Sequence, residues 1–231
     1  MIISILVFGF TSAQGFLHNM DGEVVDGNGE PILLRGFGLG GWLVPEGYML
    51  HNQAWIEGFE SPTDIENHVI NLIGQDEAND FWELYRANYV AQADIDKIAE
   101  WGFNHIRVPF HYKQFYDSTG TETPIGYAIV DELITWCQPH NIYIILDMHC
   151  APGAQNGGPI SDSDGIARLW LEDSYKELTI QIWKEIATYY ADHTLIAGYD
   201  LINEPVLPSS VSLEEFKQLY VDITEAIREV D

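Results

Sequence analysis

Four short apolar segments recur along the chain, and each is bounded by glycine, proline or other turn residues. They are rich in β-branched and aromatic side chains and apolar at nearly every position. This composition is typical of strands that are buried on both faces, as in a parallel sheet. The pattern therefore predicts strands over residues 32–37, 102–109, 142–149 and 195–203.

Segments with helical spacing of apolar residues separate these strands. One helix is expected to begin at Ser61-Pro62 and to end at Gly74, because proline is favoured in the first turn and glycine just beyond the last. Ser212 and Glu215 have the spacing of a capping box at the start of another helix. Further helices are expected over residues 93–101, 127–137 and 174–190.

This alternation of strand and helix predicts a parallel sheet, either doubly wound and open or closed as a barrel. Residues 36–42 contain glycines but no clean G-x-G-x-x-G, and Trp42 stands where a dinucleotide site needs a small residue. Polar residues instead follow the strand ends, where barrel enzymes hold their chemistry. We therefore predict an α/β fold, the first four βα units of a TIM (β/α)8 barrel, since a complete barrel needs about 250 residues. Such a half-barrel would leave two unpaired strand edges and an uncovered apolar interior.

Composition narrows the possible partners and the location. The net charge of −26 repels phosphate backbones, so we expect no nucleic acid and favour a neutral substrate, although acidic surfaces also simply keep proteins soluble. Residues 1–14 combine a short apolar run with small residues, which predicts a signal peptide that lacks the usual basic start. We thus expect a secreted, periplasmic or cell-surface protein, no membrane contact beyond export, and one domain over residues 15–231. Cys137 and Cys150 are expected to be buried thiols.

The tripeptide Asn203-Glu204-Pro205 closes the fourth predicted strand. Cleavage of a glycosidic bond needs two carboxyl groups astride the bond, one of them protonated to release the leaving oxygen. Glu204 at the mouth of a barrel could supply that proton, and the amide of Asn203 could donate to a sugar 2-hydroxyl. The tripeptide alone recurs by chance, but its place at the end of the fourth strand makes it a candidate site.

Other polar and aromatic residues near the strand ends have two interpretations each. Arg107 could keep a catalytic carboxylate ionised or form a structural ion pair. His149 could line the site or be a satisfied core histidine, and it has no second His or Cys at metal-ligand spacing. His111 and Tyr112, just past the second strand, could contact sugar or be structural, and Trp42 could stack on a sugar ring or belong to the core.

In their order along the chain, these motifs resemble glycoside hydrolase family 5, the large cellulase family, from about Phe16 to Asp231. The resemblance rests on the glycine-rich turn ending at Trp42 and on residues 106–109, 146–149 and 201–205. It implies that Arg107, His149 and Asn203 line the sugar subsite at the cleavage point and that Glu204 is the acid/base of a retaining mechanism. No cofactor, bound metal or partner protein is expected.

Residues 40–46 and 149–157 resemble the exo-β-1,3-glucanases and related glucan hydrolases, in which the glutamate matching Glu46 contacts the terminal glucose. Cys150 stands where those enzymes commonly have glycine. The family's nucleophile is a glutamate on the seventh strand, so we expect it beyond Asp231 and expect this fragment alone to be inactive. The predicted function is hydrolysis of β-glucans. The alternatives are a carbohydrate-binding pseudoenzyme, an inactive fragment or a metal-dependent barrel hydrolase.

Overall fold

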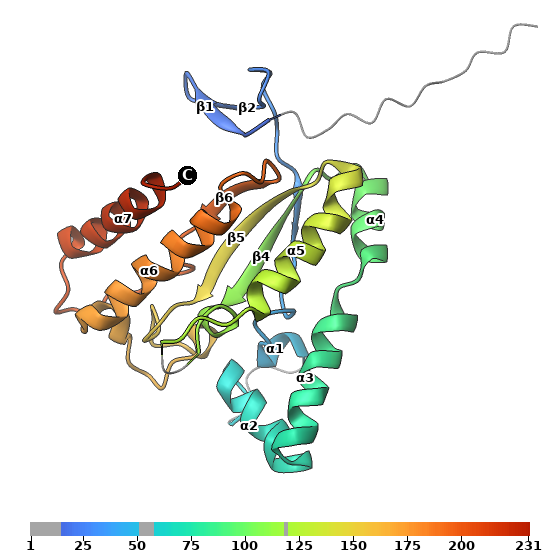
Figure 1. Ribbon diagram of the computed structural model, residues 1–231. Coiled ribbons are helices and arrows are strands. Elements are labelled where there is room, and N and C mark those ends of the chain that lie inside the picture. Colours follow the sequence, from blue (N-terminus) through green and yellow to red (C-terminus); the bar gives the residue numbers. More distant parts are fainter. Residues whose placement is uncertain (1–14, 51–57, 118–119) are drawn as a thin grey trace, which may run out of the picture.

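A computed structural model describes residues 15–50, 58–117 and 120–231. Its centre is a parallel sheet of four strands in the order β3-β4-β5-β6, with helices between consecutive strands (Figure 1). The strands are β3 (Gly36–Gly38), β4 (His105–His111), β5 (Tyr143–Cys150) and β6 (Ile196–Asp200). Strands that pair in sequence order, each joined to the next by a helical crossover, are four βα units of a TIM barrel.

The helices begin and end close to where the sequence predicts. Ser61 caps α2 and Ser212 caps α7, and in both the side chain at the third helical position bonds back to the cap, as a capping box requires. The helix α3, which directly follows Gly74, was not predicted. The helices are α1 (Gly47–Leu50), α2 (Pro62–Ile73), α3 (Gln75–Tyr89), α4 (Gln92–Glu100), α5 (Ile125–Cys137), α6 (Asp173–Tyr190) and α7 (Leu213–Arg228).

The first and last predicted strands are shorter than expected, because side chains take over the hydrogen bonds of the backbone. Before β3, the amide of Asn104 accepts from the Arg35 N–H at 2.7 Å and donates to the Leu33 carbonyl at 3.0 Å. After β6, the indole of Trp183 donates to the Leu201 carbonyl at 3.0 Å. The predictions of strand over residues 32–35 and 201–203 were therefore wrong.

A hairpin that the sequence analysis did not include precedes the sheet. Strands β1 (His18–Met20) and β2 (Glu23–Val25) pair antiparallel around Asp21-Gly22. Both turn residues have positive φ, 54° and 89°, which is the backbone that a two-residue hairpin turn of type I′ requires. The hairpin lies beyond the end of the sheet at which the strands begin (Figure 1).

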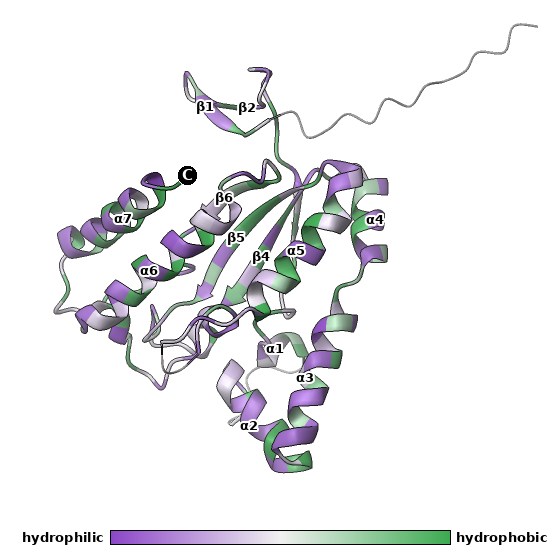
Figure 2. Cartoon of the chain, viewed as in Figure 1, coloured by the Kyte–Doolittle hydropathy of each residue, from purple (hydrophilic) through white to green (hydrophobic). Residues whose placement is uncertain are grey.

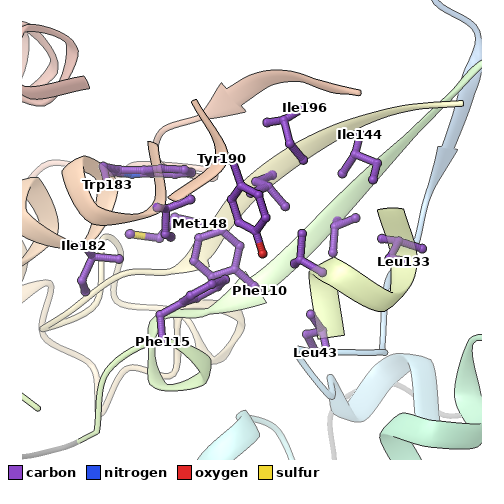
Figure 3. Packing of buried hydrophobic residues seen from close by; sticks show 14 of the residues in the cluster. Leu43, Phe110, Phe115, Leu133, Ile144, Met148, Ile182, Trp183, Tyr190 and Ile196 are labelled. Carbon is purple, nitrogen blue, oxygen red and sulfur yellow. The ribbon is translucent and has the colours of Figure 1, made fainter. Parts of the chain in front are cut away.

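The hydrophobic core lies between the sheet and helices α4 to α7. Alternate strand residues such as Val108, Phe110, Leu146 and Met148 are buried there, and Trp183 of α6 packs edge-on against Phe110 (Figure 3). Hydrophobic and hydrophilic residues alternate around α6 and α7, as expected for helices with one covered face (Figure 2). Cys137 and Cys150 are free and buried, as predicted.

The opposite face of the sheet differs from the expected apolar interior. One row across the strands joins Gly38, Arg107, Ile145 and Gly198, and the next joins Asp147 to Asp200. The interior face is therefore less apolar than expected, because glycines and charged side chains stand beside Ile145 and Pro109 in these rows.

The two outer strands of the sheet, β3 and β6, each leave one edge unpaired within the described residues, as predicted. Among the same residues, no helix is both long and apolar enough to cross a membrane.

Candidate active site

Polar side chains from three consecutive strands meet at the C-terminal end of the sheet. Arg107 extends from β4, Asp147 and His149 from β5, and Asp200 from the last position of β6, with Asn203 three residues further on. Asp147 and His149 are two residues apart on one strand and so share its face. The parallel register places Asp147 directly beside Asp200.

Arg107 is the centre of this cluster. Its Nη2 lies 2.9 Å from the Oδ2 atoms of both Asp147 and Asp200, and it donates to Asn203 Oδ1 at 2.9 Å. Nε of Arg107 also donates to Asp200 Oδ2 at 3.0 Å. The arginine therefore forms ion pairs with two aspartates, and it holds the Asn203 amide with its oxygen toward the guanidinium.

The orientation of Asn203 selects a tautomer of the His149 ring. With Oδ1 facing Arg107, Asn203 presents Nδ2 to His149 Nε2 at 3.3 Å, so this ring nitrogen is the acceptor. The proton then sits on Nδ1, which donates to Asp147 Oδ2 at 2.7 Å. Arg107, Asp147, His149 and Asn203 thus form one closed ring, in which the contact between Arg107 and Asp147 is an ion pair and the other three contacts are hydrogen bonds. Asn203 is only 8% exposed.

Two glutamates lie beside this ring. Glu46 is 4% exposed, and its Oε1 lies 3.8 Å from His149 Nε2. Burial raises the pKa of Glu46, and the charges of Glu204 and Asp147 raise it further against the opposing effect of His149. Burial likewise raises the pKa of Asp147, although His149 and Arg107 oppose it. Glu204 is exposed and has a left-handed backbone with φ of 43°.

Carboxyl groups outnumber cations in this region. Glu46, Asp147, Asp200 and Glu204 stand against the single permanent charge of Arg107. Like charges at short range favour the protonated form of a carboxyl group, and burial acts in the same direction. Both effects raise the pKa of the buried Glu46.

The structure does not bring Trp42 and His111 into this cluster. Trp42 is 3% exposed, belongs to the core and donates its indole N–H to the Arg86 carbonyl at 2.8 Å. His111 is 4% exposed, and both ring nitrogens are engaged, one by the Lys113 N–H at 3.1 Å and the other by Asp162 Oδ2 at 3.0 Å. The observed contacts agree with the prediction that Trp42 belongs to the core and with the prediction that His111 is structural.

Sequence reasoning missed four residues of the cluster and its support. Asp147 had a signal, because it is two positions from His149 on a predicted strand. No sequence pattern pointed to Asp200, since its contact with Arg107 spans 93 residues. Gln155 and Asn156 bond to the backbone of the Asn203-Glu204 turn. Both lie in residues 149–157, which resemble those of glucan hydrolases, but the sequence analysis gave neither of them a role.

Residues 63–231 match the family model described as "Cellulase (glycosyl hydrolase family 5)", so the chain belongs to glycosyl hydrolase family 5. A Beta-xylosidase of Phanerodontia chrysosporium is 33% identical over 90% of this chain and 43% of its own length. A Glucan 1,3-beta-glucosidase of Candida oleophila is 29% identical over 86% of this chain and 48% of its own length. The chain thus spans about half the length of the curated relatives it matches.

Solved structures agree with the fold. A rutinosidase from Aspergillus niger superposes with a TM-score of 0.67 at 20% identity, over 85% of this chain and 58% of its own. A beta-glucanase from Saccharophagus degradans, in complex with cellotetraose, gives 0.60 at 20% identity over 94% and 52%. The open sheet described above corresponds to part of such a barrel.

Proposed function

We propose that this chain carries the acid/base half of a retaining β-glucan hydrolase, with Glu204 as the acid/base. The observation that carries the proposal is the closed ring of Arg107, Asp147, His149 and Asn203, which lies at the strand ends immediately before Glu204. Family membership and relatives named as glucan 1,3-beta-glucosidases support it.

In this mechanism Glu204 first donates its proton to the leaving glycosidic oxygen, while a second carboxylate attacks the sugar from the opposite face. Glu204 then removes a proton from the water that hydrolyses the glycosyl-enzyme intermediate. We expect the second carboxylate in the other half of the barrel, since the chain spans about half the length of the curated relatives it matches. Asn203 keeps one N–H of its amide for a sugar hydroxyl, since the other faces His149.

The excess of carboxyl groups around the ring serves the cleavage step. During cleavage, these negative charges stabilise the positive charge that develops on the sugar ring. Glu46, buried 3.8 Å from His149, is positioned to accept hydrogen bonds from hydroxyls of the same sugar. Secretion remains a prediction, because residues 1–14 lie outside the described residues.

A second candidate substrate is a β-xyloside, because the relative at 33% identity is named a Beta-xylosidase. The two sugars differ at C5, where glucose has a hydroxymethyl group and xylose a hydrogen. Comparing kcat/KM for 4-nitrophenyl β-glucoside and β-xyloside distinguishes them. A glucan hydrolase is expected to prefer the glucoside by 10-fold or more, on the order of what one buried contact contributes.

The acid/base assignment is tested by Glu204→Gln in a chain that carries all eight βα units. General acid catalysis contributes roughly 100- to 10,000-fold, so kcat/KM should fall by that factor on laminari-oligosaccharides. A dinitrophenyl glucoside needs little protonation and should lose far less. Glu225→Gln, at an exposed helix position, is the control and should behave as wild type.

Equal losses on both substrates would rule out the acid role of Glu204. A wild-type chain that binds glucan without cleaving it would establish the pseudoenzyme. Activity that vanishes in EDTA would favour a metal-dependent hydrolase.

A further inference from the structure

Two consecutive amide side chains hold the backbone on which Glu204 sits. Gln155 is fully buried, and its Nε2 donates to the carbonyl oxygens of His149 at 2.6 Å and Asn203 at 2.9 Å. Its Oε1 accepts from the Ala151 N–H at 3.1 Å, so every side-chain atom that can form a hydrogen bond is used. The residue therefore connects the end of β5 to the carbonyl just before Glu204.

Asn156 holds the next carbonyl of the same turn. Its Nδ2 donates to the Glu204 carbonyl at 2.9 Å. The orientation of this amide is determined, because Gly158 can only donate its N–H, which it does to Asn156 Oδ1 at 2.8 Å. Ser161 Oγ lies 3.0 Å from the same oxygen, and its one hydrogen is shared among this oxygen and the carbonyls of Asn156 at 2.8 Å and Gly158 at 2.9 Å.

The backbone of Glu204 needs such support. Its φ of 43° lies in the left-handed region, which non-glycine residues adopt rarely and at a cost. Pro205 follows, so the next residue offers no N–H with which to stabilise the turn. Fixing the carbonyls of Asn203 and Glu204 fixes the two peptide planes on either side of the Glu204 Cα, and these planes set the direction of its side chain.

We propose that Gln155 and Asn156 are positioning residues that hold Glu204 in its left-handed conformation and so aim its carboxyl group at the leaving oxygen. The proposal rests on the proposed acid/base function of Glu204. The carbonyl of Gln155 also accepts from the Val206 N–H at 3.1 Å, so this pair holds the chain on both sides of Glu204. An error of about 1 Å in the placement of a catalytic group can cost on the order of 100-fold in rate.

The test is Asn156→Asp in a chain with all eight βα units. The aspartate keeps an oxygen for Gly158 and Ser161 and replaces only the donor to Glu204 with a second oxygen, which repels the carbonyl. We expect kcat/KM on laminari-oligosaccharides to fall roughly 10- to 100-fold, with a loss of at most a few-fold on a dinitrophenyl glucoside. KM for the natural substrate should change little, because no contact with sugar is removed. Asn156→Ala removes the donor without adding charge and should show the same dependence on the leaving group.

Two controls separate this result from other failures. Ser161→Ala removes hydrogen bonds to Asn156 within the same loop, leaves the donor to Glu204 in place, and should change both substrates equally and only a few-fold. Glu204→Gln, measured in parallel, must show the dependence on the leaving group, or the acid/base assignment fails and this inference with it. If Glu204→Gln shows it and both Asn156 variants lose activity equally on the two substrates, the positioning role alone is overturned. A loss in Ser161→Ala that matches the Asn156 variants would also overturn it.

Discussion

Removal of the Asp147 carboxylate tests whether the ring around Arg107 depends on one buried charge. Asp147 has a fully buried side chain; its Oδ2 accepts from His149 Nδ1 at 2.7 Å and forms an ion pair with Arg107 Nη2 at 2.9 Å. Asp147→Ala leaves the His149 donor without a partner, whereas Arg107 retains Asp200 and Asn203. Asp147→Asn keeps an acceptor oxygen at the Oδ2 position, removes the charge, and places an NH2 group at the buried Oδ1 position, which has no hydrogen-bond partner among the described residues.

The two variants should lower the free energy of unfolding by different amounts. A hydrogen bond to a charged group contributes roughly 1.5–3 kcal/mol, and an unpaired buried donor costs about 1–3 kcal/mol. Because Arg107 keeps two acceptors, the loss in Asp147→Ala comes mainly from His149, and we expect about 3 kcal/mol. Asp147→Asn should cost about 1 kcal/mol, since burial of the charge, which raises the pKa of Asp147, is relieved at the same time. Net stability of a domain is about 5–15 kcal/mol, so the alanine variant should still fold.

The assay is urea unfolding at neutral pH of both variants in a chain with all eight βα units. Asp164→Ala is the matched control, because Asp164 also pairs with an arginine, at 2.6 Å and 2.9 Å, but its side chain is 63% exposed. Exposed pairs contribute about 0–1 kcal/mol, so this variant should lose little. A loss in Asp147→Ala no larger than in Asp164→Ala would refute the reasoning, as would an asparagine variant that is as unstable as the alanine variant.

Two further predictions concern a buried glutamate and a close backbone contact. Since the pKa of Glu46 is raised above its ordinary value of 4.5, its contribution to stability is intact below about that pH and is lost as the pH rises through the folded pKa. Glu46→Gln should therefore be more stable than wild type at pH 7 and equal to it near pH 4 in urea unfolding, and a pH-independent difference would contradict this. A Cβ on Gly36 would lie 1.8 Å from the His105 carbonyl oxygen, whereas one on Gly38 would meet nothing within 4 Å. Gly36→Ala should lose about 3 kcal/mol or more and Gly38→Ala less than about 1 kcal/mol, and similar midpoints of thermal unfolding would show that β3 does not need this close approach.

Local sequence patterns determined much of the fold. Ser61 and Gly74 delimit α2, and Ser212 with Glu215 begins α7, because caps act within a few residues. The order of strands and helices predicted the parallel sheet, since a strand and its crossover form a local unit. Asp21-Gly22 carried a hairpin signal of the same kind that the analysis did not use.

The candidate site was predictable only in part. Arg107, His149 and Asn203 lie at or near the C-terminal ends of predicted strands, and parallel strands bring such ends together, so their meeting could be expected. The sequence could not tell whether each residue lines the site or is structural, because the burial and the hydrogen-bond partners of a side chain depend on segments far apart in the sequence. Trp42 is buried and donates a hydrogen bond to the carbonyl of Arg86, and a ring nitrogen of His111 forms a hydrogen bond with Asp162.

The tertiary structure alone decided how the site is held together. The link between Arg107 and Asp200 spans 93 residues, and the one between Gln155 and Asn203 spans 48. Neither Asp200 nor Gln155 belongs to a periodic or capping pattern, because each owes its place to the register between strands or to the course of a loop. Hydrogen bonds form wherever the folded chain places a donor beside an acceptor, and that placement is set by the packing of the whole sheet and not by neighbours in sequence.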